Sequence, residues 1–246
     1  MGESVLITSG KGGCGKSTFA VNCGAAMALN GKKVLLVDGD AGLRALDLML
    51  SVSDKVVYDL ADVLAGRCEP IRAIVQTDIK DLHILPAPLS ATDVMFEPGG
   101  MKRLCRGLAN YYDYVLIDSS AGIGSSMATS AAAADRAIIV ATPDPVSIRD
   151  ADRVAAVVIK HGVTDIRLVI NGIKPKLIRK KVIYGLDRAI DAAAIQLIGI
   201  VPEDEQVTVA AFRGVPVVTM GKSGAAMAFC NIARRIAGEN VPLMKL

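Results

Sequence analysis

The stretch Thr8-Ser9-Gly10-Lys11-Gly12-Gly13-Cys14-Gly15-Lys16-Ser17-Thr18 decides the fold of this chain. It satisfies G-x-x-x-x-G-K-[ST], a match that arises by chance in on the order of one chain per hundred of this length. The apolar run Val5–Ile7 precedes it and a helical pattern follows. At such a strand-to-helix turn, free backbone N–H groups and the helix dipole favour a polyphosphate. The segment therefore predicts a phosphate-binding loop.

Within this loop the residue types have distinct expected roles. The glycines let the backbone wrap phosphates, Lys16 would meet the outer phosphates, and the Ser17 hydroxyl would ligate Mg²⁺. The pattern does not require the second lysine, Lys11, so a solvated loop lysine stays open for it. The expected nucleotide-binding residues of the loop are Gly10, Lys11, Gly12, Gly13, Cys14, Gly15, Lys16, Ser17 and Thr18.

Short apolar runs alternate with helical patterns along the whole chain. The runs are too uniformly apolar for strands with one face in water, so they indicate strands that are buried on both faces. Together with the helices between them, they predict an α/β fold: a single, mostly parallel sheet covered by helices on both faces. No linker or repeat divides residues 1–246, so one domain is expected. The expected strands are 4–8, 33–37, 82–85, 114–117, 137–141, 166–170 and 197–201, and the expected helices are 16–29, 99–110, 126–134, 146–161, 182–193 and 224–237.

Two further strand ends carry acids, in Asp38-Gly39-Asp40 and in Asp118-Ser119-Ser120-Ala121-Gly122. The carboxyl ends of parallel strands share one rim, so these acids can converge with the loop on one nucleotide. Asp38 and Asp118 are then placed to hold a metal ion, and Asp40 to orient an attacking water. Lys16 and Asp40 are therefore expected to be catalytic.

Composition sets the broad class. Of 246 residues, 52% are apolar, enough for a sizeable core, and the net charge of +3 makes no case for nucleic acid or a membrane surface. The five cysteines form no CxxC pair or Cys/His cluster, which disfavours a zinc site or a disulfide framework. The N-terminus does not read as a secretion signal, and no apolar stretch reaches the ~20 residues of a membrane span. A cytoplasmic location is expected.

The phosphate loop, Asp38-Gly39-Asp40, Gly42-Leu43-Arg44-Ala45-Leu46-Asp47-Leu48 and Asp118-Ser119-Ser120-Ala121-Gly122-Ile123 together carry a family resemblance. The chain resembles the deviant Walker A ATPases and, among them, the MinD family of septum-site-determining ATPases. The resemblance covers nearly the whole length. It implies slow hydrolysis of ATP to ADP with Mg²⁺, an ATP-dependent homodimer, a MinC-like division inhibitor as partner, and a MinE-like or equivalent partner that stimulates hydrolysis.

The resemblance also implies roles for particular residues. Lys11 would reach across the dimer to the nucleotide of the other subunit, which adds it to Lys16 and Asp40 as an expected catalytic residue. Asn171 would contact the adenine, and Asp150, Asp152 and Arg153 match a helix face used for partner proteins. The loop expected to close over the base is Pro202, Glu203 and Asp204.

Three departures accompany the resemblance. Ala45 stands where the family usually has asparagine, and Gly172 where an arginine usually follows Asn171. The amphipathic membrane-targeting helix of the family would follow Val241–Met244, and the sequence ends two residues later. That helix is therefore expected to be missing, whether by truncation or by nature, and cycling to the inner face of the cell membrane would require an anchor supplied otherwise.

Three alternatives stay open. A partition ATPase of the ParA type would bind DNA through the basic residues of the run Lys174–Lys181. The favoured interpretation of that run is a solvent-exposed surface that binds no DNA. An iron–sulfur protein would need paired cysteines, and Cys105 falls inside a predicted helix. Cys14, beside two lysines at a helix start, could be redox-active, or could be a small side chain that points away from the phosphates.

Overall fold

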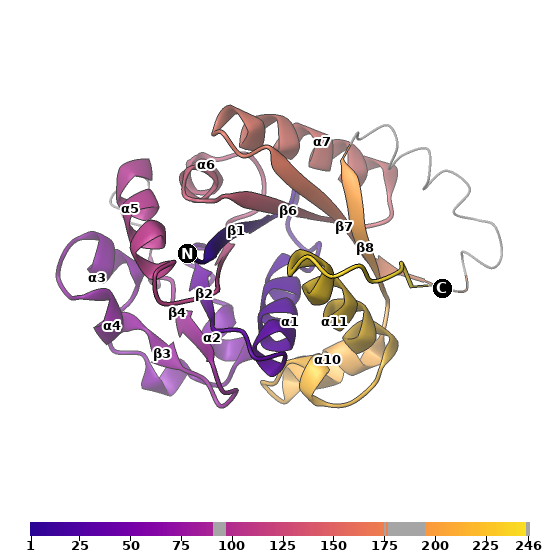
Figure 1. Ribbon diagram of the computed structural model, residues 1–246, viewed down its shortest axis with the longest axis horizontal. Helices are drawn as coiled ribbons and strands as arrows, with labels where there is room; N and C mark the ends of the chain where they lie inside the picture. Colours follow the sequence, from indigo (N-terminus) through magenta and orange to yellow (C-terminus); the bar gives the residue numbers. More distant parts are fainter. Residues whose placement is uncertain (91–96, 175, 177–194, 245–246) are drawn as a thin grey trace.

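The protein is described here by a computed structural model, which covers residues 1–90, 97–174, 176 and 195–244 of the chain (Figure 1). The phosphate-loop stretch lies between a strand and a helix as expected. The expected helix 182–193 lies outside the described residues. Throughout the described part, no helix has the length and apolar character needed to cross a bilayer.

Eight strands of the described chain form one sheet in the order β3-β4-β2-β5-β1-β6-β7-β8. All neighbouring pairs are parallel except β3, which runs antiparallel to β4. This confirms the mostly parallel α/β fold. The strands are β1 (Glu3–Thr8), β2 (Val34–Asp38), β3 (Val75–Gln76), β4 (Leu82–Leu85), β5 (Tyr114–Asp118), β6 (Arg136–Ala141), β7 (Asp165–Ile173) and β8 (Gln196–Pro202).

Helices cover both faces of the sheet (Figure 1). The long helices are α1 (Lys16–Leu29), α5 (Pro98–Leu108), α6 (Ser125–Ala132), α7 (Pro145–Lys160) and α11 (Gly224–Ile236). The shorter ones are α2 (Leu46–Met49), η1 (Ser53–Lys55), α3 (Leu60–Leu64), α4 (Pro70–Ala73), α10 (Glu205–Phe212) and η3 (Val217–Thr219).

Successive residues of the central strands point to opposite faces and join separate parts of the core. Val5 and Ile7 of β1 pack into a cluster with α1 and α11, in which Phe19 and Phe229 meet edge to face with ring centroids 6.2 Å apart. Leu6 packs on the other face with α6 and α7. A third cluster joins β2, β4 and β5 to α3 and α5. The phosphate loop is thus attached to a strand and a helix that are buried along most of their length.

Candidate functional site

The phosphate loop runs from the end of β1 into α1 at the carboxyl edge of the sheet. Gly13 and Gly15 have φ values of 80° and 85°, which L side chains rarely adopt. Gly15 is the N-cap of α1 and offers no capping side chain. The N–H groups at the start of α1 therefore remain available for an anion.

β7 fixes the same loop from the other side. The Asn171 side-chain amide donates a hydrogen bond to the Cys14 carbonyl oxygen at 2.8 Å. A Cβ on Gly15 would collide with that amide nitrogen. The hydrogen bond of Asn171 thus supports the loop, and the expected contact of Asn171 with adenine stays a prediction.

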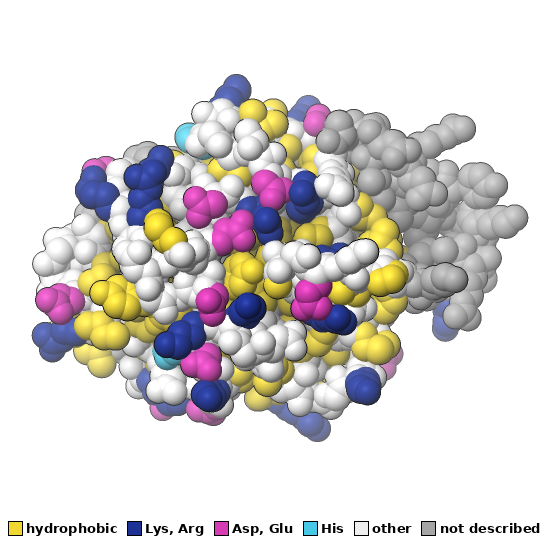
Figure 2. All heavy atoms as spheres, in the orientation of Figure 1, with side chains coloured by type: hydrophobic (Ala, Val, Ile, Leu, Met, Phe, Trp, Pro, Cys, Tyr) yellow, Lys and Arg dark blue, Asp and Glu magenta, His cyan; other side chains and the backbone are white. Residues whose placement is uncertain are grey.

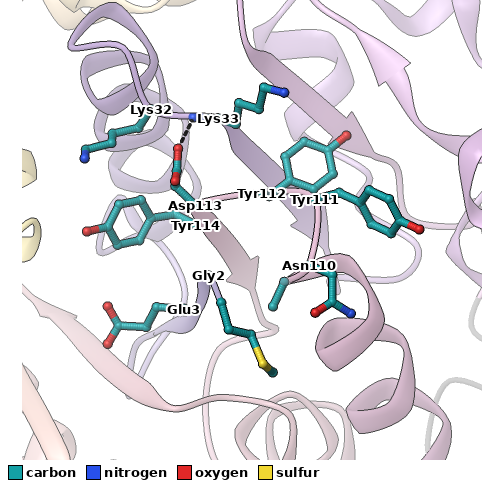
Figure 3. Close-up of a pocket in the computed structure, with 11 residues that line it drawn as sticks. Gly2, Glu3, Lys32, Lys33, Asn110, Tyr111, Tyr112, Asp113 and Tyr114 are labelled. Atoms are coloured by element: carbon teal, nitrogen blue, oxygen red, sulfur yellow. Dashed lines mark hydrogen bonds between the residues drawn. The ribbon is translucent and has the colours of Figure 1, made fainter.

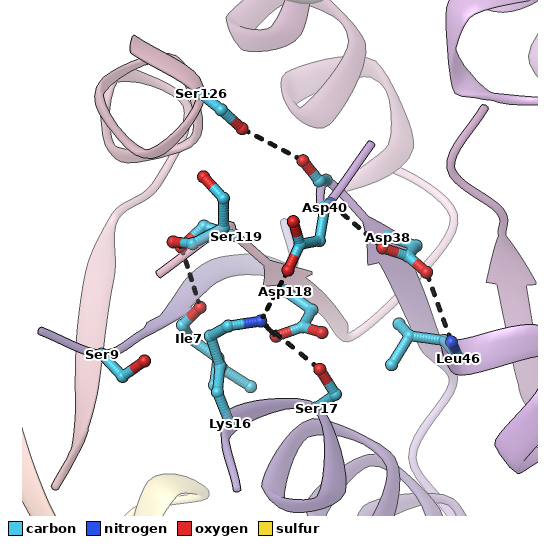
Figure 4. Close-up of polar contacts among 12 residues, drawn as sticks. Ile7, Ser9, Lys16, Ser17, Asp38, Asp40, Leu46, Asp118, Ser119 and Ser126 are labelled. Atoms are coloured by element: carbon cyan, nitrogen blue, oxygen red, sulfur yellow. Dashed lines mark hydrogen bonds and ion pairs between the residues drawn. The ribbon is translucent and has the colours of Figure 1, made fainter. Parts of the chain in front are cut away.

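Lys16 is held among the acids of two strand ends (Figure 4). Its ammonium donates to Asp118 Oδ1 at 2.8 Å, lies 3.4 Å from Ser17 Oγ, and pairs with Asp40 Oδ2 at 3.6 Å. The side chain is only 6% exposed. β2 and β5 pair in register with Asp38 opposite Asp118. The structure therefore brings together Lys16, Ser17, Asp38, Asp40 and Asp118, as the sequence predicts.

The two buried carboxyl groups have raised pKa values. Burial is the main cause that lifts the pKa of Asp38 to about 7, and the nearby Asp118 charge adds to it, against N–H donation from Asp40 and Leu46. Burial also raises the pKa of Asp118, against the charge and hydrogen bond of Lys16. Asp118 Oδ2 is buried and has no hydrogen-bond partner among the described residues.

These features fit a Mg²⁺ ion shared with a phosphate. In the described part of the chain, no group of three or more His, Cys, Asp or Glu side chains is arranged to hold a metal on its own. Mg²⁺ usually takes one or two carboxylates and completes its shell with phosphate oxygens and water. The free Asp118 oxygen, the Asp38 carboxyl and the Ser17 hydroxyl suit that kind of site.

Lys11 lies outside this cluster. Its ammonium is 3.2 Å and 3.4 Å from the two carboxylate oxygens of Asp144, in a pair whose side chains are 42% and 44% exposed. Asp144 also accepts from the Thr142 hydroxyl at 2.6 Å and from the Ser147 N–H at 2.9 Å, so it caps α7. Sequence reasoning missed this role of Asp144, although an Asp followed by Pro145 is a recognisable helix-start signal.

The first turns of α7 also support the loop. A Cβ on Gly10 would come within 2.6 Å of Asp150 Cβ, so only glycine allows this approach. Cys14 is buried with its sulfur 3.7 Å from Ser147 Oγ. This contact favours a small packed side chain at Cys14, and its redox activity stays a prediction.

The residues expected near the base have structural contacts of their own. Asp204 accepts from the Gln206 and Ala225 N–H groups, both at 3.0 Å, and Glu203 pairs loosely with Lys174 at 3.8 Å. Pro202 lies against Gly224. Gly172 has a φ of 75°, which explains why glycine suits this position. Contacts of these residues with a base stay a prediction.

Two of the alternative interpretations can be placed in the fold. Cys105 lies within α5 and is fully buried in the core, and burial raises the pKa of its thiol to about 12, which suits packing and not a thiolate ligand. Of the basic run, Lys174 and Lys176 are exposed, and the rest lies outside the described residues.

A separate hollow of about 440 Å³ opens at the amino edge of the sheet, the edge opposite the phosphate loop (Figure 3). Acids and bases both line it, including Glu3, Lys32, Lys33 and Asp113. Asp113 already accepts a hydrogen bond from the Lys33 N–H at 2.8 Å. We therefore assign the candidate nucleotide site to the carboxyl edge and not to this hollow.

Comparison with known proteins decides the family. Residues 2–167 match a family model described as an AAA domain. The septum site-determining protein MinD of Thermotoga maritima is 39% identical over 246 residues, which cover 99% of this chain and 91% of that protein. The chain belongs to the MinD family of P-loop ATPases.

Solved MinD structures have the same fold along the whole chain. The MinC:MinD cell division protein complex of Aquifex aeolicus matches with a TM-score of 0.91 and 36% identity, covering 99% of this chain and 98% of that one. MinD of Pyrococcus horikoshii complexed with Mg-ADP matches with a TM-score of 0.84 and 30% identity, covering 96% of both chains. MinD-family membership thus confirms the resemblance carried by the loop and the two acidic segments.

Proposed function

We propose that this MinD-family chain is an ATP-dependent molecular switch that takes part in placing the division septum. The observation that carries the proposal is the joint placement of Lys16, Asp38 and Asp118 at one edge of the sheet, with the phosphate loop. The MinD structure with Mg-ADP supports nucleotide binding, and the names of the relatives support the division role.

The proposed chemistry follows from the residue types. Lys16 exchanges its carboxylate partners for the outer phosphates, and the N–H groups of the loop hold the other phosphate oxygens. Ser17, Asp38 and Asp118 would hold Mg²⁺, which supplies charge neutralisation between the phosphates. Asp40, 18% exposed beside Lys16, orients the attacking water. Hydrolysis is slow until a partner completes the site.

The active form is proposed to be a homodimer with the two carboxyl edges facing each other. At the carboxyl edge of the sheet, four exposed apolar side chains follow β2, β4, β5 and β6, and we call them the apolar rim. Exposed apolar side chains gathered near a ligand site are typical of a protein contact. The rim consists of Leu43, Leu89, Ile123 and Val146. Lys11, beside this rim and half-exposed, is placed to reach a neighbouring nucleotide.

Two lysine variants test these roles separately. Lys16→Gln removes the cation at the outer phosphates, so nucleotide binding should fall below detection in a fluorescent-nucleotide titration. Lys11→Ala should bind ATP within a few-fold of wild type but fail to dimerise with ATP and Mg²⁺ in light scattering. If Lys11→Ala dimerises as well as wild type, the trans role of Lys11 is wrong.

The proposed partners follow from the relatives. MinD of Aquifex aeolicus was solved in complex with MinC, so we propose a MinC-like division inhibitor for this chain, and a MinE-like or equivalent protein that stimulates hydrolysis. On α7, Asp152 and Arg153 are exposed close to the Lys11 and Asp144 pair. The protein is proposed to act in the cytoplasm, and at the inner face of the membrane when an anchor is supplied.

A further inference from the structure

A second hollow, of about 540 Å³, lies at the amino edge of the sheet, away from the proposed nucleotide site. Its walls come from α5, from the connection between α6 and β6, and from the end of α7. Its volume is within the ~300–1,000 Å³ of small-molecule sites. No role proposed above uses it. The residues that matter for its chemistry are Lys102, Arg106, Asp135 and His161.

Cations dominate the polar part of this wall. Lys102 and Arg106 are one turn apart on α5, and His161 is the C-cap of α7. Neither Lys102 nor Arg106 forms an ion pair with any described residue, whereas Arg103, on the same helix, pairs with Glu97 at 3.7 Å. Figure 2 shows Lys and Arg side chains gathered over α5.

One carboxylate faces these cations. Asp135 is the single acid among the residues that line the hollow, and its Oδ2 accepts a hydrogen bond from the Ser4 N–H at 2.9 Å. A hydrogen bond from a backbone N–H partly offsets the carboxylate charge. Lys102 and Arg106 therefore leave an excess of positive charge along the wall.

Helix ends explain only part of this charge. The carbonyl ends of α5, α6 and α7 all lie around the hollow, and a basic side chain in a last turn stabilises such an end. Arg106 and His161 fit that role. Lys102 lies six residues before Leu108, the last residue of α5. This separation is about 9 Å along the helix axis, so Lys102 lies outside the last turn. Its charge is available for a ligand.

We propose that this hollow is a binding site for a phosphate-bearing anion, with Lys102 as the cation that the helix ends leave free, and with Arg106 and His161 as further donors whose N–H groups are shared between the helix ends and the anion. A phosphate group offers several acceptor oxygens, the guanidinium of arginine can donate two parallel N–H bonds, and lysine adds a point charge. The source of the phosphate is a soluble phosphorylated molecule or a phospholipid headgroup. This site is separate from the nucleotide site, so it stands or falls independently of the proposed ATPase.

The two histidines of the chain provide the reporter, because an imidazole NMR spectrum contains signals from His83 and His161 only. The full chain is saturated with Mg²⁺ and ADP to block the phosphate loop, then titrated with inorganic pyrophosphate at constant ionic strength. His161 signals, assigned with His161→Gln, should shift saturably while those of His83 stay in place. A parallel titration uses vesicles of phosphatidylglycerol.

Variants decide whether Lys102 and Arg106 form the site. The double variant Lys102→Ala, Arg106→Ala should bind pyrophosphate at least tenfold more weakly, and Arg103→Ala, from the same helix, should bind like wild type. Unchanged circular dichroism shows that the variants fold. A response to pyrophosphate or to vesicles that the double variant loses supports the site and identifies its source. No response to either, a response that survives in the double variant, or equal shifts of both histidines overturns it.

Discussion

At the scale of residues, the two lysines of the phosphate loop are held in different ways. Lys16 is buried against Asp118 and Asp40, so its charge stays inside the site. Lys11 is tethered by Asp144 in a pair that is half-exposed to water. Exposed pairs of this kind contribute about 0.2–1 kcal/mol, so the tether is weak enough to break when a second subunit arrives.

The first residue-scale prediction concerns Asp144→Asn. Asparagine still caps α7, since Asn and Asp are comparable N-caps, but it removes the charge that attracts Lys11. Each symmetric dimer breaks two such pairs, one in each subunit, at about 0.2–1 kcal/mol each, so ATP-dependent dimerisation should then occur at about 2- to 30-fold lower protein concentration. Analytical ultracentrifugation with ATP and Mg²⁺ measures it.

Asp152→Asn is the matched control, because Asp152 is an exposed acid of the same helix and forms no ion pair among the described residues. It should dimerise like wild type. Equal or weaker dimerisation of Asp144→Asn would show that the Lys11 pair does not restrain assembly.

The sequence predicted which residues gather at the carboxyl edge better than it predicted their long-range partners. Lys16, Asp38 and Asp118 could be predicted because the loop spacing and the strand-end rule act locally. The pairing of Lys11 with Asp144 joins residues 133 apart, and no local pattern marks it. The Asn171 contact with Cys14 escaped prediction for the same reason.

At the scale of elements, Asp204 connects two helices. One carboxylate oxygen caps α10 at Gln206, and the other accepts from Ala225 at the start of α11. Burial pushes the pKa of Asp204 upward, but hydrogen bonds from Ala225, Ser223 and Gln206 outweigh burial, and its pKa lies below the ordinary value. The ionised carboxylate therefore stabilises the folded state.

Asp204→Ala should lower the free energy of unfolding by about 1–2 kcal/mol at pH 7, as expected for a lost helix cap. Because the folded-state pKa is depressed, this stabilisation is present above the unfolded value of ~3.9 and is lost as pH falls through the folded value. Urea unfolding at pH 7 and pH 3 measures the difference between variant and wild type, which should shrink at pH 3.

Glu203→Ala serves as the control, since this neighbouring side chain is exposed and makes only a long pair with Lys174. It should change stability by less than about 0.5 kcal/mol. A loss for Asp204→Ala that is no larger than this, or that grows toward pH 3, would contradict the double cap.

Long elements agree with the sequence to within a few residues. The helix 16–29 and the strand 82–85 have the predicted bounds, and the other predicted strands and described helices differ by one to three residues at their ends. β3 and the helices α2, α3 and α4 were missed, because two to five residues are too few to show a period. The eight-residue helix α10 was missed as well, because only Ala210 of it is buried and no apolar stripe marks it.

At the scale of the whole molecule, the alternation of strands and helices predicted a parallel sheet but not the order of its strands. The order of the strands depends on which face of the sheet each connecting helix crosses. The residue pattern within a strand does not predict that face. The carboxyl edge was nonetheless predictable as the site, because every parallel order places these strand ends on one rim.

The apolar rim leads to the whole-molecule prediction. Leu89→Asp puts a charge into the proposed contact between two carboxyl edges, so ATP-dependent dimerisation should weaken at least tenfold while ATP binding stays within twofold of wild type. Ile71→Asp is the control, because Ile71 lies beside Tyr111 and Tyr112 near the amino edge and is 70% exposed, against 72% for Leu89. Light scattering and nucleotide titration measure both. Similar behaviour of the two variants would place the contact elsewhere.

The position of β1 has a consequence for how the chain folds as it is made. β1 is the first strand synthesised, yet its neighbours in the sheet are β5 and β6, which are complete only at residues 118 and 141. Asn171, which fixes the phosphate loop, comes later still. A nascent chain folds from the residues already synthesised. About two-thirds of this chain must therefore leave the ribosome before the phosphate loop acquires its final shape.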